Sequence, residues 1–498
     1  MNCYDFDGTI YRKDCSKRFY AYCFFKKPFI MMFHIWKVMF FLVLNIVGFI
    51  NTKKFKEKFF SFLRYFKNID EIINSFWNKE KKYINNWYYE LKKDNDVICS
   101  ASPDFLVGFI MKSINPKSTV LCTDMDKNTG IINGDNLKGE SKVQALKDKL
   151  KKDDLKFENV YTDSFSDFPL LDMAKNKKIV CGNKYYDFGS QKPTLKSKLL
   201  YSIKLLRIKH YVKNILIFLP LFFSGLLSDF QSIFNSIIGF IAFCFMASFV
   251  YIVNDIADVN NDRKHTKKRK RPIACYMIKR YEAIIYAILL FALSVGITYF
   301  TFGFNILIYI ILIGYAVINL LYSFILKNIP IVDSFMLALC YLLRIFWGGV
   351  IIGTTVSKWL YLTVLCGALF MGFGKRRNEI KHQKDSTRKV NKYYNYNFLD
   401  KNLYICLAMS LVFYSLWAID FKGYGEGSFN RIILLATIPF VYFIMMRYSL
   451  DIEQNDNNGD PIDVLLKDFV LIFACVVFVA LIVISVYVPI QFNLEVLL

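Results

Sequence analysis

Three aspartates follow an apolar run at a spacing that suits metal binding. Asn254 ends the run, and Asp255, Asp258 and Asp262 follow at positions i, i+3 and i+7. A helix would place these three carboxylates on one face, with the Asn254 oxygen beside them. Carboxylates at a membrane boundary are costly unless they bind cations, and a cluster of hard oxygens suits Mg²⁺ and, through it, a diphosphate. A solvated helix end is the alternative interpretation.

A basic stretch follows these acids directly. Residues 263–273 read RKHTKKRKRPI. Cations just beyond a metal–carboxylate cluster can hold the phosphate oxygens that the metal leaves exposed. The tendency of membrane proteins to keep Lys and Arg in cytoplasmic loops explains some of this charge, but not its position beside the acids.

A second pair of carboxylates lies near the N-terminus, in CYDFDGT at residues 3–9. Asp5 and Asp7 are two residues apart, so at a strand end both side chains point into one crevice. The first can attack phosphorus, and the second, when protonated, can give a proton to the leaving oxygen. Gly8 permits the tight turn that follows. A metal-binding or capping turn is the alternative.

Further polar residues follow in order along the same region. Ser100 comes after an apolar run and can donate a hydrogen bond to a phosphoryl oxygen. Lys142 can offset the charge of the nucleophile and the phosphoryl group. Asp163 and Asp167 follow another apolar run, and Asp163 would complete a hard oxygen site for Mg²⁺ with Asp5.

This ordered set resembles the haloacid dehalogenase superfamily, in its phosphoserine-phosphatase-like branch. The resemblance covers residues 1–190 and implies an α/β Rossmann-like domain with a helical cap at residues 12–90. It also implies that Asp5 forms an aspartyl-phosphate, that Asp7 acts as acid and base, and that Ser100 and Lys142 bind phosphate.

The same resemblance implies a bound Mg²⁺. Its ligands would be Asp5, the backbone carbonyl of Asp7, and Asp163, with Asp167 supporting either the metal site or Lys142. One departure from the family pattern is Thr162, which stands where the family usually has glycine.

The apolar residues are unevenly distributed along the chain. Hydrophobic residues make up 55% of the 498 positions, and after about residue 205 they gather into long runs. Each run can cross a bilayer core of ~30 Å with ~20 helical residues. We therefore predict a multidomain chain, with a domain at 1–190, a linker at 191–204, and a membrane domain at 205–498.

The two domains should differ in secondary structure. Short apolar runs in the first predict buried parallel strands alternating with helices, at 97–99, 118–122, 159–161 and 178–181. The second is predicted to be an all-α polytopic bundle of about nine transmembrane helices, centred near residues 220, 242, 290, 314, 342, 366, 411, 438 and 478.

The distribution of charge predicts how the chain is oriented. Basic loops follow the second and sixth apolar segments, on the same side as the N-terminal domain if every segment crosses once. The positive-inside rule then places this domain and both loops on the cytoplasmic side of the inner membrane. The net charge of +23 comes with no nucleic-acid-binding motif, so nucleic acid is not predicted as a partner. The twelve Cys form no CxxC pair, which argues against a disulfide framework or a zinc site.

Residues 28–50 do not fit this simple topology. They are apolar enough to span, although His34 and Lys37 interrupt them. A single crossing would separate Asp5 from the later phosphatase motifs. We favour a cap element lying in the membrane interface; a re-entrant hairpin and a buried cap helix are the alternatives.

The pattern NDxxDxxxD followed by KRxRPI resembles the UbiA-type prenyltransferase superfamily, over residues 200–498. Ordinary members of this superfamily transfer a prenyl group from its diphosphate to an aromatic acceptor, using two Asp-rich loops that hold two Mg²⁺ ions. Here the second loop, GKRRNEI at 374–380, carries one acid among cations.

The replacement of acidic by basic residues in the second loop suits a substrate with more phosphate groups than a prenyl diphosphate, such as phosphoribosyl pyrophosphate. Within the superfamily the sequence looks most like the polyprenyl-phosphate phosphoribosyltransferases, an interpretation that the motifs RIKHYVKN at 207–214 and RIFWGG at 344–349 support. The implied reaction joins a membrane polyprenyl phosphate to ribose C1 and expels pyrophosphate. It needs no general base, because the acceptor oxygen is already anionic.

The resemblance also implies roles for individual residues. Asn254, Asp255 and Asp258, with Asp262, would hold Mg²⁺ on the leaving diphosphate. The candidates for binding phosphate or sugar groups of donor and acceptor are Lys213, Lys267, Arg271, Lys375, Arg377 and Glu379.

The two domains together suggest consecutive reactions on one lipid. The transferase would make a 5-phosphoribosyl lipid, and the phosphatase would remove its 5-phosphate, supplying lipid-linked pentose for cell-envelope glycans. The alternatives are an aromatic prenyltransferase with an independent phosphatase, and a non-catalytic membrane scaffold. A homo-oligomer is compatible with the sequence.

Overall fold

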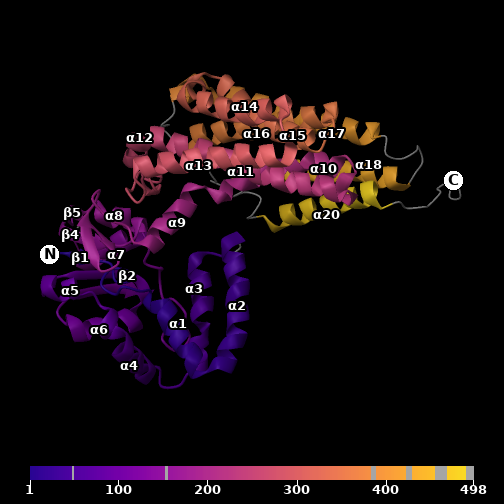
Figure 1. Cartoon of the computed structure of the whole chain (residues 1–498). Helices are drawn as coiled ribbons and strands as arrows, with labels where there is room; N and C mark the ends of the chain where they lie inside the picture. Colours follow the sequence, from indigo (N-terminus) through magenta and orange to yellow (C-terminus); the bar gives the residue numbers. More distant parts are fainter. Residues whose placement is uncertain (48–49, 152–154, 383–388, 422–428, 455–467, 489–498) are drawn as a thin grey trace. The chain divides into compact units, whose positions relative to one another are not determined.

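The chain forms two compact units in the computed structural model (Figure 1). The structure describes residues 1–47, 50–151, 155–382, 389–421, 429–454 and 468–488. The first unit, called here the sheet unit, comprises Met1–Ser202 and Val259–Lys279. The second, the helical unit, comprises Ile203–Asp258 and Arg280–Leu498.

A six-stranded sheet forms the centre of the sheet unit. Its strand order is β3-β2-β1-β4-β5-β6; neighbouring strands are parallel except for β5 and β6. The strands are β1 (Cys3–Tyr4), β2 (Val97–Pro103), β3 (Thr119–Thr123), β4 (Phe157–Thr162), β5 (Ala174–Cys181) and β6 (Lys184–Asp187). The predicted α/β fold and its four predicted strands are confirmed. The carboxyl ends of β1, β2 and β4 meet at one edge, where an open α/β sheet usually places its site.

A helical insertion separates β1 from β2, in the region predicted to form the cap. It contains α1 (Cys15–Lys26), α2 (Pro28–Val47), α3 (Thr52–Phe60), η1 (Ser61–Tyr65), α4 (Ile69–Glu80), η2 (Lys81–Tyr83) and α5 (Asn86–Leu91). Packed aromatic rings hold these helices together, with Phe19, Phe62 and Phe76 each buried. The burial of these large side chains gives the insertion its own apolar core.

The rest of the sheet unit surrounds the strands with short helices. They are α6 (Asp104–Ile114), α7 (Glu140–Leu150), η3 (Phe165–Asp167), α8 (Phe168–Leu171) and α9 (Leu195–Leu205), together with α12 (Val259–Lys264) and η6 (Lys268–Lys270). Helix α9 covers most of the predicted linker and continues into the helical unit.

The basic segment Val259–Lys279 folds as part of the sheet unit, although it is distant from the strands in sequence. Cys275 and Met277 are buried in the same apolar cluster as strand and helix residues of this unit. Arg269 forms an ion pair with Asp172 (2.6 Å), and Gln191 donates to the carbonyl of Cys275. The segment Val259–Lys279 is therefore a structural component of the sheet unit.

We expect Met277→Asp to destabilise the sheet unit and thereby to lower the phosphatase activity that the sequence predicts for it. The reason is the cost of an unpaired charge in an apolar core. Thermal unfolding and hydrolysis of p-nitrophenyl phosphate check this, with Met277→Leu as the matched control that keeps the volume apolar. Unchanged activity in Met277→Asp would contradict the prediction.

The helical unit contains seven helices that are long and apolar enough to cross a membrane, among the residues described. They are α11 (Phe230–Ala257), α13 (Arg280–Phe302), α14 (Ile306–Phe324), α15 (Val332–Ile351), α17 (Tyr396–Asp420), α18 (Phe429–Gln454) and α20 (Phe469–Tyr487). The shorter elements are η4 (Ile208–Phe218), α10 (Leu219–Phe223), η5 (Leu226–Ser228), η7 (Leu326–Asn328) and η8 (Lys389–Tyr393). The unit is thus a polytopic membrane bundle.

Two of the predicted membrane segments take a different form. The segment near residue 220 is split between η4 and α10, with Pro220 in the first turn of α10. Proline suits a first turn but interrupts a helix interior. The segment near residue 366 lies in α16 (Lys358–His382), whose last turns carry several charges and are not apolar like a membrane span.

Candidate active sites

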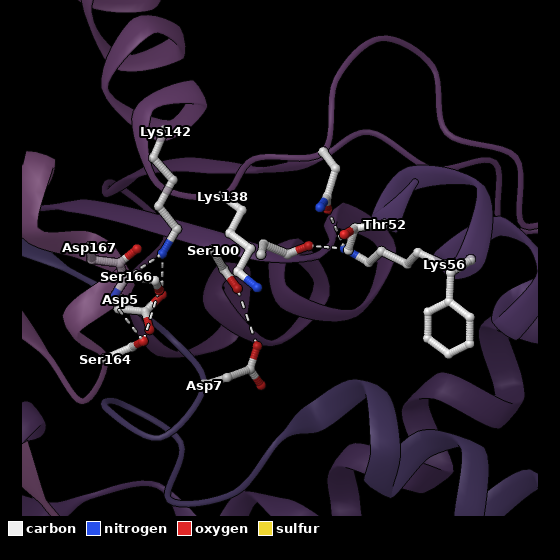
Figure 2. A pocket seen from close by; sticks show the side chains of 13 residues that line it. Asp5, Asp7, Thr52, Lys56, Ser100, Lys138, Lys142, Ser164, Ser166 and Asp167 are labelled. Carbon is white, nitrogen blue, oxygen red and sulfur yellow. Dashed lines mark hydrogen bonds and ion pairs between the residues drawn. The ribbon is translucent and has the colours of Figure 1, made fainter. Parts of the chain in front are cut away.

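Two acidic side chains and one lysine form buried ion pairs at the edge of the sheet where β1 and β4 end. The buried amino group of Lys142, from α7, donates to Asp5 (2.8 Å) and to Asp167 (2.9 Å) (Figure 2). Burial raises the pKa of Asp5 to about 7, against the influence of Lys142. Burial alone would lower the pKa of Lys142, but the two carboxylates raise it well above its usual value. Lys142 therefore stays charged and helps to hold Asp5 ionised.

Asp167 has a second partner that its sequence motif did not reveal. The hydroxyl of Thr162 donates to Asp167 (3.1 Å) and accepts a hydrogen bond from the Ser164 amide (3.1 Å). Thr162 thus orients the carboxylate that anchors Lys142, and the threonine found in place of the usual glycine has a structural role here.

Asp7 occupies a different hydrogen-bonding environment from Asp5. It accepts hydrogen bonds from the Cys15 amide (2.6 Å), from Ser100 (3.3 Å) and from Ser102 (2.5 Å). Burial raises the pKa of Asp7, while the bonds from Cys15 and Ser102 act in the opposite direction. A carboxyl group with a raised pKa is suited to carry a proton to a leaving oxygen.

Asp163 lies against the turn that follows Asp5. A Cβ atom added to Gly8 would stand 2.1 Å from a carboxylate oxygen of Asp163, and Gly8 has φ +74°. Gly8 follows Asp7 in the turn after β1. Position 8 therefore requires a residue without a side chain, because Asp163 occupies the space that a side chain would take.

We expect Gly8→Ala to lower phosphatase turnover strongly, because the new methyl group displaces Asp163 or the turn, and a positive φ is strained for alanine. Gly134, which also has a positive φ but open space around its Cβ position, is the matched control. Steady-state hydrolysis of p-nitrophenyl phosphate compares the two variants. Equal losses in Gly8→Ala and Gly134→Ala would attribute the effect to backbone strain alone.

The acids at this sheet edge fit a bound Mg²⁺. No set of three or more His, Cys, Asp or Glu side chains that could hold a metal occurs in the described part of the chain. Mg²⁺, however, is usually held by one or two carboxylates together with water and substrate phosphate. Asp5 and Asp163 supply two carboxylates for such a site. In the ion pairs described for Asp5 and Asp167, the only cationic partner is Lys142.

Asp5, Lys142 and Asp167 line a cavity of about 290 Å³, whereas Asp163 is not among its lining residues. The lining residues are Asp5, Asp7, Thr52, Phe55, Lys56, Ser100, Ala101, Asn136, Lys138, Lys142, Ser164, Ser166 and Asp167. The structure thus brings together four of the predicted phosphatase residues, Asp5, Asp7, Ser100 and Lys142, with Asp167 beside them.

Helix α3 of the insertion supplies three of the lining residues, Thr52, Phe55 and Lys56. Lys56 projects from this helix and donates to Asn136 (2.9 Å) and to the carbonyl of Ala101. Sequence reasoning missed Lys56, because it stands among other lysines in NTKKFKEKFF and nothing in that run distinguishes it. Its position makes it a candidate ligand for the substrate phosphate.

We expect phosphomonoester binding to weaken as the pH rises above about 8. Burial lowers the pKa of Lys56 to about 8, so its charge is present below that pH and lost above it. KM for p-nitrophenyl phosphate should therefore rise on the alkaline side, and Lys56→Arg should move this rise to higher pH, since a guanidinium stays protonated. A wild-type KM that stays constant through this range would contradict the assignment.

The aspartates predicted to share one helix face are divided by a helix end. Helix α11 stops at Ala257 with Asp258 as its C-cap, and α12 begins at Val259. The prediction that one helix presents all three acids is therefore wrong. Asp and Asn compete for backbone hydrogen bonds and favour helix ends, which explains the break in this Asp- and Asn-rich stretch.

Each of these aspartates has a cationic partner. Asp255 is buried and pairs with Arg207, and Asp258 lies 3.8 Å from Lys327, both within the helical unit. Asp262 lies in the sheet unit, where it pairs with Arg271 at 2.7 Å. Sequence reasoning included Asp262 and Arg271 but did not foresee that they pair with each other.

The side chain of Asn254 fits a role as a cation ligand. Its side-chain oxygen is buried and accepts no hydrogen bond from the residues described. An unpaired buried acceptor is costly. Together with Asp255 one residue later and Asp258 at the helix end, it supplies the hard oxygen ligands that Mg²⁺ prefers. The helical unit thus fits Mg²⁺ at Asn254, Asp255 and Asp258.

The second basic motif is helical, so the prediction of a loop at 374–380 is wrong. It forms part of α16, and its arginines are buried in ion pairs. Arg376 contacts Asp333 (2.7 Å) and Glu379 (2.9 Å), and Arg377 contacts Asp400. Asp333 comes from α15, so an acidic group does stand beside this motif, supplied by a different helix.

The remaining predicted phosphate ligands are spread over both units. Lys213 lies half-buried in η4 and Lys375 half-buried in α16, both in the helical unit. Lys267 is exposed and, like Arg271, belongs to the sheet unit.

Comparisons with known proteins agree with this division. Residues 3–172 match the haloacid dehalogenase-like hydrolases, and residues 217–467 match the UbiA prenyltransferase family. The decaprenyl-phosphate phosphoribosyltransferase of Corynebacterium glutamicum is 33% identical over 291 residues, which cover 57% of this chain and 86% of that protein. The enzyme of the same name from Mycobacterium tuberculosis is 31% identical over 279 residues, 54% of this chain and 88% of that protein.

A solved structure of a UbiA homologue from Archaeoglobus fulgidus, bound to GPP and Mg²⁺, aligns with 58% of this chain and 99% of its own, at 19% identity and a TM-score of 0.45. The family matches confirm the resemblances recognised in both parts of the sequence. The chain is an integral membrane protein that combines a transferase with a phosphatase-type hydrolase domain, and it belongs to the UbiA prenyltransferase family.

Proposed function

We propose that the helical unit transfers a 5-phosphoribosyl group from phosphoribosyl pyrophosphate to a polyprenyl phosphate, and that the sheet unit then removes the 5-phosphate from the lipid product. The observation that carries the first part is the 33% identity to a decaprenyl-phosphate phosphoribosyltransferase over 86% of that protein's length.

The charges of the helical unit support this donor. Arg207, Lys327 and Arg377 stand in the same unit as Asp255 and Asp258, and Arg207 and Lys327 pair with these aspartates. A donor with phosphate at both C1 and C5 of ribose needs more cationic groups than a prenyl diphosphate. Lys213, Lys375 and Arg377 are the candidates for the additional phosphate, with Glu379 supporting the basic motif through Arg376.

The transfer depends on position and charge. A bound Mg²⁺ would supply charge neutralisation at the leaving diphosphate, held by Asn254, Asp255 and Asp258. The acceptor phosphate oxygen bonds to ribose C1 as the bond from C1 to the diphosphate oxygen breaks, and pyrophosphate leaves with the electron pair. No proton is removed, so orientation and electrostatic stabilisation account for the catalysis.

The phosphatase step uses the residues around the cavity. A carboxylate oxygen of Asp5 attacks phosphorus, the bond to the ribose C5 oxygen breaks, and Asp7 gives that oxygen a proton. Asp7 then takes a proton from a water that attacks the aspartyl-phosphate, which releases phosphate and restores Asp5. Ser100, Lys142 and Lys56 hold the phosphoryl oxygens, and Mg²⁺ at Asp5 and Asp163 would offset their charge.

Both reactions belong on one side of the membrane, because the product of the first is the substrate of the second. The basic segments 263–271 and 375–392 favour the cytoplasmic side. We place the sheet unit there as well.

In the test, membranes that contain the full chain are incubated with one of two labelled donors, and the lipids are then extracted. Ribose-labelled phosphoribosyl pyrophosphate with added polyprenyl phosphate should label the lipid fraction, and labelled prenyl diphosphate with an aromatic acceptor should give no new product. Label incorporated only from prenyl diphosphate would identify an aromatic prenyltransferase.

A further inference from the structure

The outer side of helix α2 carries an exposed row of aromatic side chains. Phe29, Phe33, Trp36 and Phe40 follow a spacing of four, three and four residues, which places them on one face of the helix. Their exposed fractions are 79%, 75%, 70% and 61%. We call these four residues the outer face of α2. Exposed apolar patches of this kind mark sites that bind a protein, a ligand or a membrane.

The opposite side of α2 is fixed to the insertion. Met31 and His34 are buried, and the His34 ring makes hydrogen-bond contacts with Tyr20 (3.0 Å) and Ser61 (3.1 Å). Lys37 also donates to Ser61, at 3.2 Å. The polar residues that interrupt the apolar segment are therefore used for internal packing, and this packing leaves the aromatic row facing outward.

Helix α2 is directly connected to the phosphatase cavity. It packs against α3, and α3 supplies Thr52, Phe55 and Lys56 to the cavity wall. One pair of helices thus presents exposed aromatic rings on α2 and a cavity-lining lysine, Lys56, on α3.

We propose that the outer face of α2 lies in the interface of the lipid bilayer, and that the cavity therefore takes a phosphomonoester carried by a membrane lipid. The inference about the substrate rests on the proposed function, whereas the inference about the bilayer rests on α2 itself.

We choose a bilayer as the partner of the outer face of α2 because the same chain contains a membrane bundle. The sheet unit is continuous in the chain with a unit that has seven helices long and apolar enough to cross a membrane, so a bilayer is available to an exposed apolar face. Helices that lie in the membrane interface carry Trp, Phe and Leu on their apolar face. Lys26 precedes α2, and Lys54 stands in the first turn of α3. Both would attract anionic headgroups, whereas Lys27 and Lys53 donate to the carbonyls of Tyr65 and Gly134.

The experiment uses the full chain in vesicles of phosphatidylcholine and phosphatidylglycerol, labelled with bimane at Phe33→Cys. Glu71→Cys, on the exposed side of α4, is the matched control, and the unsubstituted chain gives the background from native cysteines. Doxyl-labelled lipid should remove most of the emission at position 33 and leave that at position 71. Aqueous iodide should do the reverse.

Two outcomes would overturn the bilayer assignment. Quenching by iodide at both positions would show that the outer face is in water. Protection of position 33 from both quenchers would show that protein covers it, either another part of this chain or a second copy.

A second measurement tests the substrate separately. In Phe33→Asp/Trp36→Asp, hydrolysis of p-nitrophenyl phosphate should equal that of the wild type, because neither residue lines the cavity, and removal of phosphate from the phosphoribosyl lipid in vesicles should fall several-fold. Equal rates on the lipid would overturn the role of the outer face in delivering substrate, even though transfer by the helical unit would still be observed. Absence of phosphoribosyl transfer in the wild-type protein would instead refute the proposed function.

Discussion

Asp255→Asn is expected to lower phosphoribosyl transfer by about 10²–10³-fold, the range typical for loss of one electrostatic contact to a transition state. The substitution keeps the size of the side chain but removes the charge that would help hold the cation on the leaving diphosphate. It also leaves Arg207 without its carboxylate partner. The measurement is the initial rate of label transfer from phosphoribosyl pyrophosphate to polyprenyl phosphate in vesicles.

The opposite end of the same helix provides a matched control. Asp229 caps the N-terminus of α11, where its side chain accepts from the amides of Gln231 and Ser232. Asn is an equally good N-cap, so Asp229→Asn should retain the wild-type rate. A rate for Asp255→Asn close to that of Asp229→Asn would contradict the assignment of Asp255 to the transferase site.

Asp5→Asn is expected to lower phosphatase turnover by at least about 10³-fold, because an amide cannot act as the nucleophile. Transfer by the helical unit should continue, so the 5-phosphorylated lipid should accumulate. The measurements are hydrolysis of p-nitrophenyl phosphate and chromatography of the extracted lipid. Loss of transfer in this variant would contradict the consecutive scheme.

The control for this variant is an aspartate outside the cavity. Asp94 is exposed and pairs with Lys117, so Asp94→Asn should change neither activity. The fold of Asp5→Asn should persist, because Lys142 retains Asp167 as a partner.

The sequence was most informative where chemistry and periodicity agree. Short apolar runs before Ser100 and Asp163 predicted strands β2 and β4, because a strand buried on both faces is apolar throughout. Because Ser100 and Asp163 follow these parallel strands, both were expected at the same edge of the sheet. Asp5 and Asp7 were expected at this edge because a strand end was predicted before them, whereas Lys142, which lies on α7, was predicted from the resemblance to the haloacid dehalogenase superfamily.

Contacts between distant segments could not be predicted in this way. The pairing of Arg376 with Asp333 joins two helices, and no local pattern indicates it. Lys56 reaches the cavity only because the insertion folds back over the sheet. The packing of Cys275 and Met277 into the sheet unit depends on tertiary contacts that hydropathy does not reveal.

The helix break at Asp258 illustrates a different limit. Spacing alone is compatible with one continuous helix, but spacing does not say where the helix ends. Competition between Asp or Asn side chains and the backbone decides the end, and this assigns Asp262 to a different helix and a different unit from Asp255.

Two consecutive reactions on one lipid can be followed with a doubly labelled donor. The full chain in vesicles receives polyprenyl phosphate and phosphoribosyl pyrophosphate carrying ¹⁴C in the ribose and ³²P at the 5-phosphate. The lipid should gain ¹⁴C without ³²P, and the ³²P should appear as inorganic phosphate. A lipid that permanently retains both labels would contradict the phosphatase step, and a lipid with neither label would contradict the transfer.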